Sequence, residues 1–366
     1  MPVIRAAVCH RFNDPLVIQN VNLRAPVAGE VEVTLAAVAI CHSDISFATG
    51  AWGGTLPAVY GHEASGYVSA MGDSVAGFAV GDAVLVTMLR ACGTCQSCAQ
   101  GRRVLCETPY DRDCGPLTTL AGGTLSHGLY VGGFAERVVV DQSQIARLPS
   151  DIPMDAACLL ACGVITGVGA VVNTAAVRPG ETVVVIGVGG VGLNVIQGAY
   201  IAGASRIIAV DMTAGKLAAA AEFGATHGIL ATDPDPWDQV RLLTRGRGAD
   251  AVFVAVGVTA AYDNAMHYLA RGGRMVMVGM PHSGAMATYE PVVVAASGQV
   301  MQGSLLGDGV MRYDVGWLTE LYRQGRLKLD ELVSGRWPLE QINEAIADTL
   351  KGAARRNVIV LKLRSA

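Results

Sequence analysis

The stretch Thr182-Val-Val-Val-Ile186-Gly-Val-Gly-Gly-Val-Gly192 decides the fold of this chain. Its β-branched residues predict a short strand, its glycines predict a tight turn, and an apolar-periodic helix is expected over Val191–Ala202. The alternation continues, with further strands expected at Arg206–Val210, Ala251–Val256 and Arg274–Val278 and helices at Lys216–Phe223, Trp237–Thr244 and Ala261–Leu269. Strands that alternate with helices favour a doubly wound α/β domain with a parallel sheet.

The sequence on either side of this domain has a different pattern, in which short expected strands follow one another without helices between most of them. Up to about residue 150, short apolar runs are separated by Gly, Asp and Ser, which predicts strands at Met1–Cys9, Val31–Val38, Ala64–Val68, Asp82–Thr87 and Ala135–Val140. After about residue 307, a helix over Tyr313–Gln324 and a final strand over Asn357–Leu363 return to this style. We therefore expect two domains, a β-rich one formed by 1–163 and 307–366 and an α/β one inserted as 164–306.

Composition and charge exclude several classes of function. The 366 residues carry a formal net charge of −4 and have a pI near 6.0, so neither nucleic acid nor an anionic membrane is expected as a partner. No apolar run approaches the ~18–20 residues of a membrane span, and the first residues lack the apolar core of a signal peptide. We therefore expect a cytoplasmic protein, whose nine cysteines are metal ligands or thiols rather than a disulfide framework.

The glycine-rich turn predicts a dinucleotide site. The segment Gly187-Val-Gly189-Gly-Val-Gly192 fits G-x-G-x-x-G, and Asp211 ends the next expected strand. In this pattern Gly187 makes the turn, Gly189 lets the backbone approach the pyrophosphate, and Gly192 lets the helix lie close to the strand. Asp211 would accept hydrogen bonds from the adenine-ribose hydroxyls and repel a 2′-phosphate, which favours NAD over NADP. Lys216 could reach the same ribose. The alternative for the whole pattern is a structural glycine turn with an Asp at the end of a strand, and the alternative for Lys216 is an exposed helix lysine.

The most specific feature of the chain is a group of four cysteines. Cys92-Gly-Thr-Cys95-Gln-Ser-Cys98 is followed by Cys106 after a short interval. Four thiolates brought together by short loops form a closed tetrahedral site that suits a structural zinc. The alternatives are an iron–sulfur cluster, for which no electron-transfer context is present, and two disulfides, which the expected compartment disfavours.

A second set of metal-ligand side chains is dispersed along the chain. Cys41, His62 and Cys162 form no motif by spacing alone, and a buried cysteine or histidine is usually only part of a packed core. Their neighbours favour a functional role, because Cys41-His42-Ser43-Asp44 and Gly61-His62-Glu63 are more polar than a strand-rich core requires. Two thiolates and one imidazole would supply the three protein ligands of a catalytic zinc.

Together these motifs resemble the zinc-containing medium-chain alcohol dehydrogenases over essentially the whole chain. They occur in the family's order: Cys41-His-Ser-Asp, Gly61-His-Glu, the four cysteines, Cys162-Gly-Val-Ile-Thr166-Gly, the glycine-rich turn and Asp211. The resemblance implies a GroES-like catalytic domain built from both chain ends, a Rossmann domain between them, and two zinc ions per subunit. It implies that Cys41, His62 and Cys162 hold the catalytic zinc, and that the four clustered cysteines hold the structural zinc.

The resemblance also implies roles for further residues. Asp44 would orient His62, Glu63 would be an occasional alternative ligand, and Ser43 would accept the alcohol proton. The residues implied in cofactor binding are His42 and Arg356 at the pyrophosphate, Thr166, Val256 and Ser304 at the nicotinamide, and Gly187, Gly189, Gly190, Val191, Gly192, Asp211 and Lys216 in the dinucleotide fold. The substrate pocket would be lined by apolar residues, namely Trp52, Met88, Leu105 and Val258.

The function implied by this resemblance is reversible hydride transfer between a primary aliphatic or aromatic alcohol and NAD. A catalytic zinc would lower the pKa of the alcohol, and the nicotinamide would accept the hydride. A homodimer is expected, with a tetramer as the alternative, because the stretch Cys106–Gly133 is long and resembles that of the dimeric members. One departure concerns Ser46, which stands where many family members have the histidine that ends the proton relay.

Three other functions stay open. A thiol-adduct formaldehyde dehydrogenase, of the S-hydroxymethyl-glutathione type, would share every zinc motif but would need charged groups where this chain has Ala51-Trp52-Gly53. A polyol or threonine dehydrogenase usually has Glu as the third zinc ligand, where this chain has Cys162. A non-catalytic, zinc-stabilised binding protein would have no need of Cys41, His62 and Ser43 together.

Overall fold

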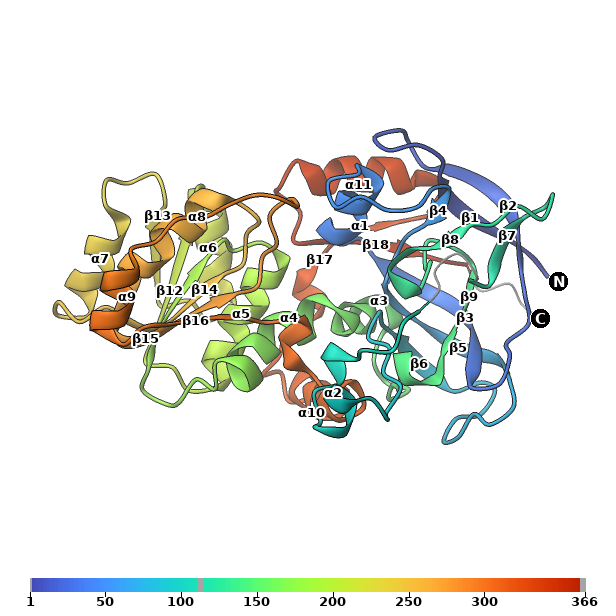
Figure 1. Ribbon diagram of the computed structural model, residues 1–366, viewed down its shortest axis with the longest axis horizontal. Helices are drawn as coiled ribbons and strands as arrows, with labels where there is room; N and C mark the ends of the chain where they lie inside the picture. The colour runs from blue at the N-terminus through green and yellow to red at the C-terminus, as the bar shows by residue number, and fades with distance from the viewer. Residues whose placement is uncertain (1, 111–114, 363–366) are drawn as a thin grey trace. The chain divides into compact units, whose positions relative to one another are not determined.

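The computed structural model describes residues 2–110 and 115–362 and divides into two compact units. One unit is formed by Met1–Cys162 and Val310–Ala366, and the other by Gly163–Gly309, as the colours of Figure 1 allow the reader to follow. The domain boundaries expected from the sequence, after residues 163 and 306, lie close to the ends of these units. The identity of the units as functional domains stays a prediction.

The first unit carries elements from both ends of the chain. Its strands are β1 (Val3–Cys9), β2 (Val17–Leu23), β3 (Glu30–Ala39), β4 (Ala58–Val59), β5 (Glu63–Met71), β6 (Ala83–Val86), β7 (Leu117–Thr119), β8 (Ser126–His127), β9 (Arg137–Asp141), β10 (Ile145–Arg147), β17 (Val333–Trp337) and β18 (Arg356–Val360). Its α-helices are α1 (His42–Ala48), α2 (Gln96–Ala99), α3 (Met154–Ala157), α10 (Met311–Arg323) and α11 (Ile342–Leu350).

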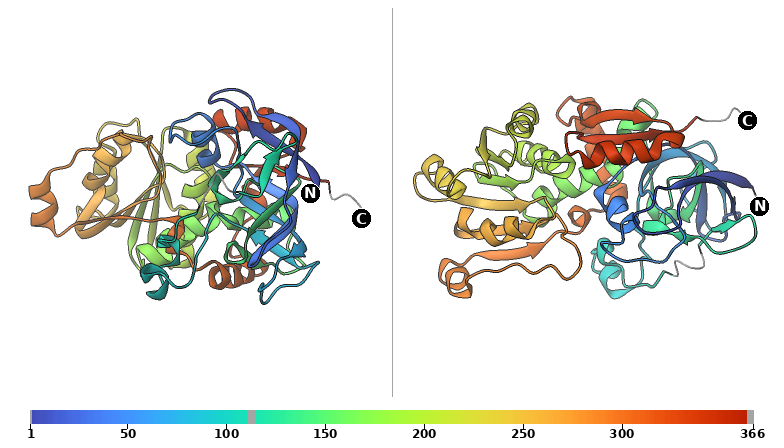
Figure 2. Two further views of the ribbon diagram at one scale, coloured as in Figure 1. Left: turned by 45° about the vertical axis from the view of Figure 1, so that its right-hand side comes forward. Right: turned by 90° about the horizontal axis from the view of Figure 1, so that it is seen from above.

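Two sheets organise the described strands of this unit. One has the order β10-β6-β5-β3-β18-β17, with β9 also pairing with β3, and the other has the order β7-β2-β1-β4-β8. Because β18 pairs antiparallel with β3, the last strand joins a sheet of the N-terminal segment, which Figure 2 shows as red beside blue. The interior of this unit is a continuous apolar core that includes the fully buried Phe134 and Leu35. In the sheet that contains β3 and β5, the last residue of β3 pairs with the first residue of β5. The site residues described below lie at or next to these two positions.

The strands expected from the sequence in this unit are present, with shifts of a few residues at their ends. β9 starts at Arg137 rather than Ala135, and the final strand is β18, which ends at Val360. Leu363, the last residue of the expected final strand, lies outside the described residues. Strand β17 and helix α11 were not expected, because the apolar spacing of α11 is carried by only a few residues among alanines and acidic side chains.

The second unit has one parallel sheet with helices. Its strands are β11 (Thr182–Ile186), β12 (Arg206–Asp211), β13 (His227–Leu230), β14 (Ala249–Val254), β15 (Leu269–Met277) and β16 (Val300–Gly303). Its α-helices are α4 (Gly163–Gly169), α5 (Gly190–Ile201), α6 (Ala214–Glu222), α7 (Pro236–Leu243), α8 (Thr259–Ala265) and α9 (Pro291–Ser297).

The strand order of this sheet is that of a doubly wound fold. Among the described residues it runs β13-β12-β11-β14-β15-β16, and every neighbouring pair is parallel. The strand order reverses between β11 and β14, since β12 and β13 are added on one side of β11 and β14, β15 and β16 on the other. This is the place where open parallel sheets bind ligands. The expected fold class, a β-rich unit combined with a doubly wound α/β unit, is confirmed.

The burial of the second unit's strands explains which of them the sequence revealed. All five residues of β11 are buried, as Val and Ile in the middle of a parallel sheet covered on both faces should be. In β13, by contrast, Ile229 is the one buried residue, and β16 lies at the edge with no buried residue. These two short strands were not expected, because two adjacent apolar residues in a segment of four produce no alternating pattern.

No single helix in the described part of the chain is long and apolar enough to cross a membrane. One bent pair, Met154–Ala161 with Gly163–Thr174, meets the criteria of length and composition, as buried core helices also do. The eight described cysteines are free thiols, and Cys114 lies outside the described residues.

Candidate functional site

The glycine-rich turn joins β11 to α5 and leaves an open backbone surface. Gly187 has a φ of +85°, which favours glycine, and a Cβ on Gly192 would lie 2.0 Å from the Gly187 carbonyl oxygen. Gly192 therefore permits the first turn of α5 to pack directly on the turn that precedes it. At Gly189, the residue before the helix, a Cβ would meet no atom within 4 Å. The backbone amides at the start of α5, those of Gly190 and Val191 included, thus have space for an anionic ligand.

Asp211 is tied to this turn. It ends β12, its side chain is almost fully buried, and its Oδ2 accepts a hydrogen bond of 2.9 Å from the Val188 amide. Its Oδ1 lies 3.4 Å from the Thr213 amide and 4.0 Å from Lys216 Nζ. The carboxylate and the glycine turn are therefore held in one arrangement, with Lys216 beside them.

The other residues expected near the nicotinamide belong to the same unit. Thr166 lies on α4, and its buried Oγ1 has no hydrogen-bond partner among the described residues. The Ser304 amide donates to the Met277 carbonyl, and its hydroxyl pairs with Thr174. Val256 follows β14 and would touch a Cβ on Gly187, while Val258, at the start of α8, is 52% exposed.

The dispersed metal-ligand residues converge in the first unit. One ligand atom from each of Cys41, His62, Glu63 and Cys162 lies within 4.8 Å of the others, and all four residues are buried. Cys41 is the residue before α1, and Cys162 follows the 3-10 helix η4 (Cys158–Ala161). His62 directly precedes β5, and Glu63 is the first residue of this strand. Three elements far apart in the sequence thus supply one compact set of donors, two sulfurs, one imidazole and one carboxylate.

His62 is oriented by Asp44. Its Nδ1 lies 2.9 Å from Asp44 Oδ1, which also accepts from the Gly61 amide, while Oδ2 accepts from the Cys41 amide. His62 Nε2 is buried and has no hydrogen-bond partner among the described residues, so its lone pair faces the cysteines. Burial alone would lower the pKa of His62, but the Asp44 carboxylate raises it, which makes Nε2 a stronger ligand. This arrangement fits a metal ion, because a buried nitrogen would otherwise stay unsatisfied.

Glu63 is held beside the cysteines by Arg356. Burial raises the pKa of Glu63 to about 8, although the Arg356 guanidinium, 3.3 Å away, opposes this shift. Arg356 is itself buried, and its Nε and Nη2 have no hydrogen-bond partner among the described residues. The expected place of Arg356 at a pyrophosphate stays a prediction, because both donors are buried beside the metal-ligand set.

The expected proton-relay residues lie on α1 next to the metal-ligand set. Ser43 Oγ lies 3.7 Å from Cys41 Sγ, and Ser43 is half-buried. His42 is exposed at the first position of the helix, where a backbone amide end attracts anions. Ser46 is half-buried on the same helix, and its carbonyl accepts from the Thr49 hydroxyl.

Three of the four expected pocket residues lie in the first unit. Trp52 packs edge-on against Phe47 of α1, with ring centroids 5.4 Å apart. Met88 follows β6 and packs against the core, and Leu105 lies on the 3-10 helix η1 (Arg103–Leu105). The pocket assignment stays a prediction, and Val258 belongs to the second unit.

The four clustered cysteines form the second metal-ligand set, and they are less buried than the first. One sulfur from each of Cys92, Cys95, Cys98 and Cys106 lies within 4.8 Å of the others. The amides of Thr94 and Cys95 donate to Cys92 Sγ, and the Cys92 amide donates to Cys106 Sγ. Hydrogen bonds of this kind, from the Thr108 side chain first, lower the pKa of Cys92 to about 5. These hydrogen bonds favour the thiolate of Cys92, the form that binds zinc, whereas burial raises the pKa of Cys98 to about 12.

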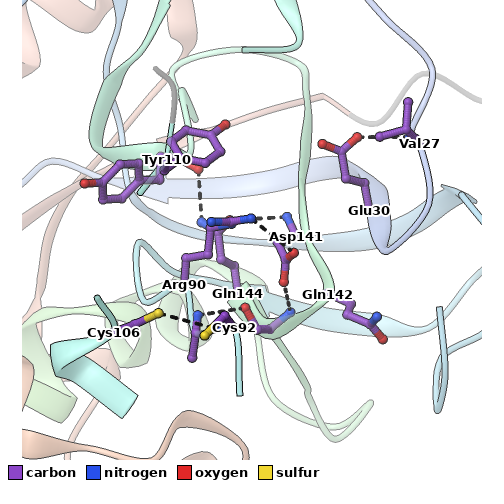
Figure 3. Close-up of polar contacts among 12 residues, drawn as sticks. Val27, Glu30, Arg90, Cys92, Cys106, Tyr110, Asp141, Gln142 and Gln144 are labelled. Atoms are coloured by element: carbon purple, nitrogen blue, oxygen red, sulfur yellow. Dashed lines mark hydrogen bonds and ion pairs between the residues drawn. The ribbon is translucent and has the colours of Figure 1, made fainter. Parts of the chain in front are cut away.

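Two residues around these sites had no role in the sequence analysis. Gly61 has a φ of +94°, and a Cβ there would lie 2.6 Å from the Phe134 amide, so only glycine lets His62 enter the site at this angle. Arg90 lies 5.0 Å over the Tyr110 ring and 3.9 Å from Asp141, as Figure 3 shows beside Cys92 and Cys106. For Gly61, the neighbouring His62 and Glu63 were a signal in the sequence. For Arg90, no local sequence signal indicated a role.

Comparison with known proteins supports the resemblance to alcohol dehydrogenases over most of the chain. A model described as the alcohol dehydrogenase GroES-like domain matches residues 27–150, and one described as zinc-binding dehydrogenase matches residues 190–322. The NDMA-dependent alcohol dehydrogenase of Amycolatopsis methanolica is 36% identical, over 97% of this chain and 98% of that protein. The S-(hydroxymethyl)glutathione dehydrogenase of Saccharomyces cerevisiae is 34% identical, over 97% of this chain and 95% of that protein. The solved structure of benzyl alcohol dehydrogenase from Acinetobacter calcoaceticus has a TM-score of 0.93 at 29% identity, over 99% of this chain and 100% of that one.

Proposed function

The chain belongs to the zinc-containing medium-chain alcohol dehydrogenases, which use zinc and a nicotinamide cofactor, and from this premise we propose that it transfers a hydride reversibly between a primary alcohol and NAD. The observation that carries the proposal is the buried convergence of Cys41, His62, Glu63 and Cys162 beside Ser43. A set of donors that served only to stabilise the fold would not need a hydroxyl 3.7 Å from one of its sulfurs.

In the proposed arrangement Cys41, His62 and Cys162 hold the catalytic zinc, and Glu63 stays paired with Arg356 as a nearby fourth donor. Zinc bound there would act as a Lewis acid that lowers the pKa of an alcohol hydroxyl. Asp44 engages His62 through Nδ1, which leaves Nε2 as the nitrogen that would bind the metal ion. The Cys92, Cys95, Cys98 and Cys106 set would hold a structural zinc.

Ser43 is proposed as the proton acceptor. Its hydroxyl lies 3.7 Å from Cys41 Sγ, and it would accept the alcohol proton while donating its own toward the cofactor ribose. His42, exposed at the start of α1, and Arg356 would bind the pyrophosphate. Thr166, whose buried hydroxyl lacks a partner among the described residues, would pack at the nicotinamide, with Val256 and Ser304 offering backbone groups.

The preference for NAD rests on Asp211. Its carboxylate is held by the Val188 amide at the glycine turn, where a 2′-phosphate would meet a fixed negative charge. We expect kcat/KM with NAD to exceed that with NADP by about 100-fold or more, and the Asp211→Gly variant to narrow this gap mainly through KM. Steady-state kinetics with both cofactors measures the ratio, with Lys216→Ala as a control for the neighbouring charge. Equal efficiencies in the native enzyme contradict the proposal.

The proposed substrates are primary alcohols with an aliphatic or aromatic tail. Trp52, Met88, Leu105 and Val258 are apolar, and apolar walls disfavour polyols and charged substrates. We expect NADH formation, followed by absorbance, to be faster with benzyl and medium-chain alcohols than with glycerol or sorbitol. Trp52→Ala should raise efficiency for bulky alcohols relative to ethanol by about 10-fold or more, since a few methylenes are worth this much in a pocket. A preference for polyols overturns the pocket assignment.

A second candidate activity is oxidation of S-(hydroxymethyl)glutathione, because a relative of 34% identity has that name. The stretch Ala51-Trp52-Gly53 has no charge to receive the carboxylates of such a substrate, which favours the simple alcohols. The same NADH assay, with formaldehyde plus glutathione against formaldehyde alone, separates the two activities. A rate that depends on glutathione and exceeds the benzyl alcohol rate favours the second candidate.

We propose that the enzyme is a cytoplasmic homodimer that pairs through the exposed edge of the second unit's sheet. Strand β16 ends the sheet order, α9 has no buried residue, and Met286 and Val292 are 83% and 71% exposed. Between Met280 and Leu305 the sequence has one Asp, Glu, Lys or Arg, namely Glu290, so a two-fold axis would bring few like charges together. Sedimentation of the native chain against a Val292→Asp variant tests this, and an unchanged dimer in the variant excludes this surface.

A further inference from the structure

The backbone that carries Cys162 is held by a buried hydroxyl. Thr87 Oγ1 donates a hydrogen bond of 2.8 Å to the carbonyl oxygen of Ala161, and both residues are fully buried. Ala161 ends the 3-10 helix η4, and Cys162 departs from helical geometry with a φ of −146° and a ψ of −69°. The Thr87 hydroxyl thus satisfies a carbonyl at the residue where the chain turns to direct the Cys162 sulfur toward Cys41 and His62.

Thr87 is fixed in turn by Gln144. The Thr87 amide donates to the Gln144 carbonyl at 3.0 Å, and Gln144 Nε2 donates back to the Thr87 carbonyl at 3.0 Å. Gln144 is 1% exposed, and its side chain also bonds the Tyr130 carbonyl and the Asp141 amide. Because each polar atom of this amide has a partner, the side chain has one favoured position, and Thr87 is held on two sides.

The turn that contains Gln144 also reaches the other cysteine set. The 3-10 helix η3 (Gln142–Gln144) includes Ser143, whose Oγ accepts a hydrogen bond of 3.0 Å from the Ala91 amide, the residue before Cys92. Figure 3 shows Gln144 and Asp141 in the same neighbourhood as Arg90, Cys92 and Cys106. One short turn therefore contacts both ends of the stretch from Thr87 to Ala91.

We propose that Thr87 is a positioning residue for Cys162, and that Gln144 holds Thr87 for this purpose. The proposal rests on the proposed function in one respect, because it takes the Cys41, His62 and Cys162 set to be the catalytic zinc site. Without the Thr87 hydroxyl, the Ala161 carbonyl would be buried without this donor, and the chain would move to find another. Cys162 is the next residue, so such a movement displaces a ligand sulfur directly.

The test compares three variants of the full chain. Thr87→Val keeps the shape of the side chain and removes the hydroxyl, whereas Thr87→Ser keeps the hydroxyl. Thr319→Val is the matched control, because Thr319 is also buried and donates to a carbonyl, that of Gly316, on a helix without metal ligands. Each zinc-loaded protein is dialysed against increasing chelator, and zinc per subunit is measured by elemental analysis.

In Thr87→Val the more easily removed zinc should dissociate at a chelator concentration about 10–100-fold lower than in the native protein, as for other residues that orient ligands. Thr87→Ser and Thr319→Val should behave like the native protein. Alkylation mapped to peptides should show Cys41 and Cys162 becoming reactive in Thr87→Val, while Cys92 and Cys106 stay protected. This readout needs no alcohol, cofactor or turnover.

Two outcomes overturn the inference. Equal zinc retention in Thr87→Val and Thr319→Val means that the hydroxyl only stabilises the fold. If Thr87→Val does not fold, Gln144→Met replaces it, and unchanged protection of Cys162 in that variant also contradicts the inference. Failure of the proposed function would give a different result. If these residues bind no zinc, Cys41 and Cys162 are not protected from alkylation by zinc even in the native protein, whatever the residue at position 87.

Discussion

The two cysteine sets of the first unit both offer sulfur ligands to a metal ion, but they differ in the sequence distance between their members and in their burial. Cys92, Cys95, Cys98 and Cys106 come from one short stretch, and Cys92 and Cys106 are partly exposed. The other set, which contains Cys41, is drawn from three distant elements, and every member is buried. A contiguous set organises its own loop, whereas a dispersed set needs the whole sheet to exist first.

The difference also shows in what surrounds the sulfurs. The contiguous cysteines receive hydrogen bonds mostly from their own loop, such as those from the Cys95 and Thr94 amides to Cys92. The dispersed set is held by partners remote in sequence, such as Arg356 beside Glu63 and Thr87 on the carbonyl before Cys162. Local hydrogen bonds suit a site that stabilises a loop, and remote ones suit a site whose geometry has to serve a reaction.

The largest difference between the two sets is expected when one thiol is removed from each. Cys162→Ser should lower turnover by several orders of magnitude while leaving a folded, NAD-binding protein, because it removes a ligand and not a fold determinant. Cys95→Ser should lower the melting temperature by several degrees and release one zinc, since the loop loses its cross-link. Turnover, calorimetry and elemental analysis on both variants measure the contrast.

A native, active subunit that contains one zinc or fewer would contradict the two-site arrangement. So would a Cys95→Ser variant with native stability and two zinc ions. Cys158→Ser is the matched control, because Cys158 is a buried cysteine outside both metal-ligand sets and should leave turnover and zinc content near native.

A second prediction concerns how the contiguous set is attached to the unit. His127 is buried, its Nε2 lies 2.6 Å from the Val131 carbonyl, and its Nδ1 lies 2.8 Å from the hydroxyl of Tyr110, which follows Cys106 by four residues. Burial lowers the pKa of His127 to about 4. The unfolded chain, with an ordinary histidine pKa near 6.5, therefore binds the proton more readily than the folded chain does.

The contribution of neutral His127 to the free energy of unfolding is therefore fully present above pH 6.5. It decreases as the pH falls from 6.5 toward 4, by up to about 3 kcal/mol. Chemical denaturation at several pH values measures the loss. His127→Gln removes the titrating group, so its stability should depend less on pH in this window. An identical pH profile in this variant would contradict the assignment of the effect to His127.

The smallest expected effect concerns proton exit from the dispersed set. Ser46 cannot titrate near neutral pH, so the proton accepted by Ser43 has to leave through the cofactor ribose to water. Ser46→His should raise kcat/KM for alcohol oxidation at pH 6–7 by a few-fold. Ser43→Ala, which removes the first acceptor, should cost far more than Ser46→Ala. Single-turnover rates check this when cofactor release limits kcat. Equal damage from both alanine variants would make Ser46 an essential relay residue.

Much of the fold could be predicted from the sequence because its signals are local. The Val/Ile run of β11 and the glycines after it specify a strand, a turn and a helix within a few residues of one another. The four clustered cysteines are local in the same sense, since a short loop leaves them few other ways to meet. Strands β13 and β16 escaped prediction because each buries at most one residue, and their pairing comes from the neighbouring strands.

The sequence by itself determined which chemistry was present: thiolates, one imidazole beside a carboxylate, and a glycine turn followed by an acid. Only the tertiary structure decided that Cys41, His62 and Cys162 meet, because residues separated by 21 and 100 positions are brought together by sheet pairing and not by spacing. It alone placed Thr87 on the carbonyl before Cys162 and Arg356 beside Glu63. A threonine or an arginine carries no sign of its partner, since the partner is chosen by the packing of distant elements around one buried point.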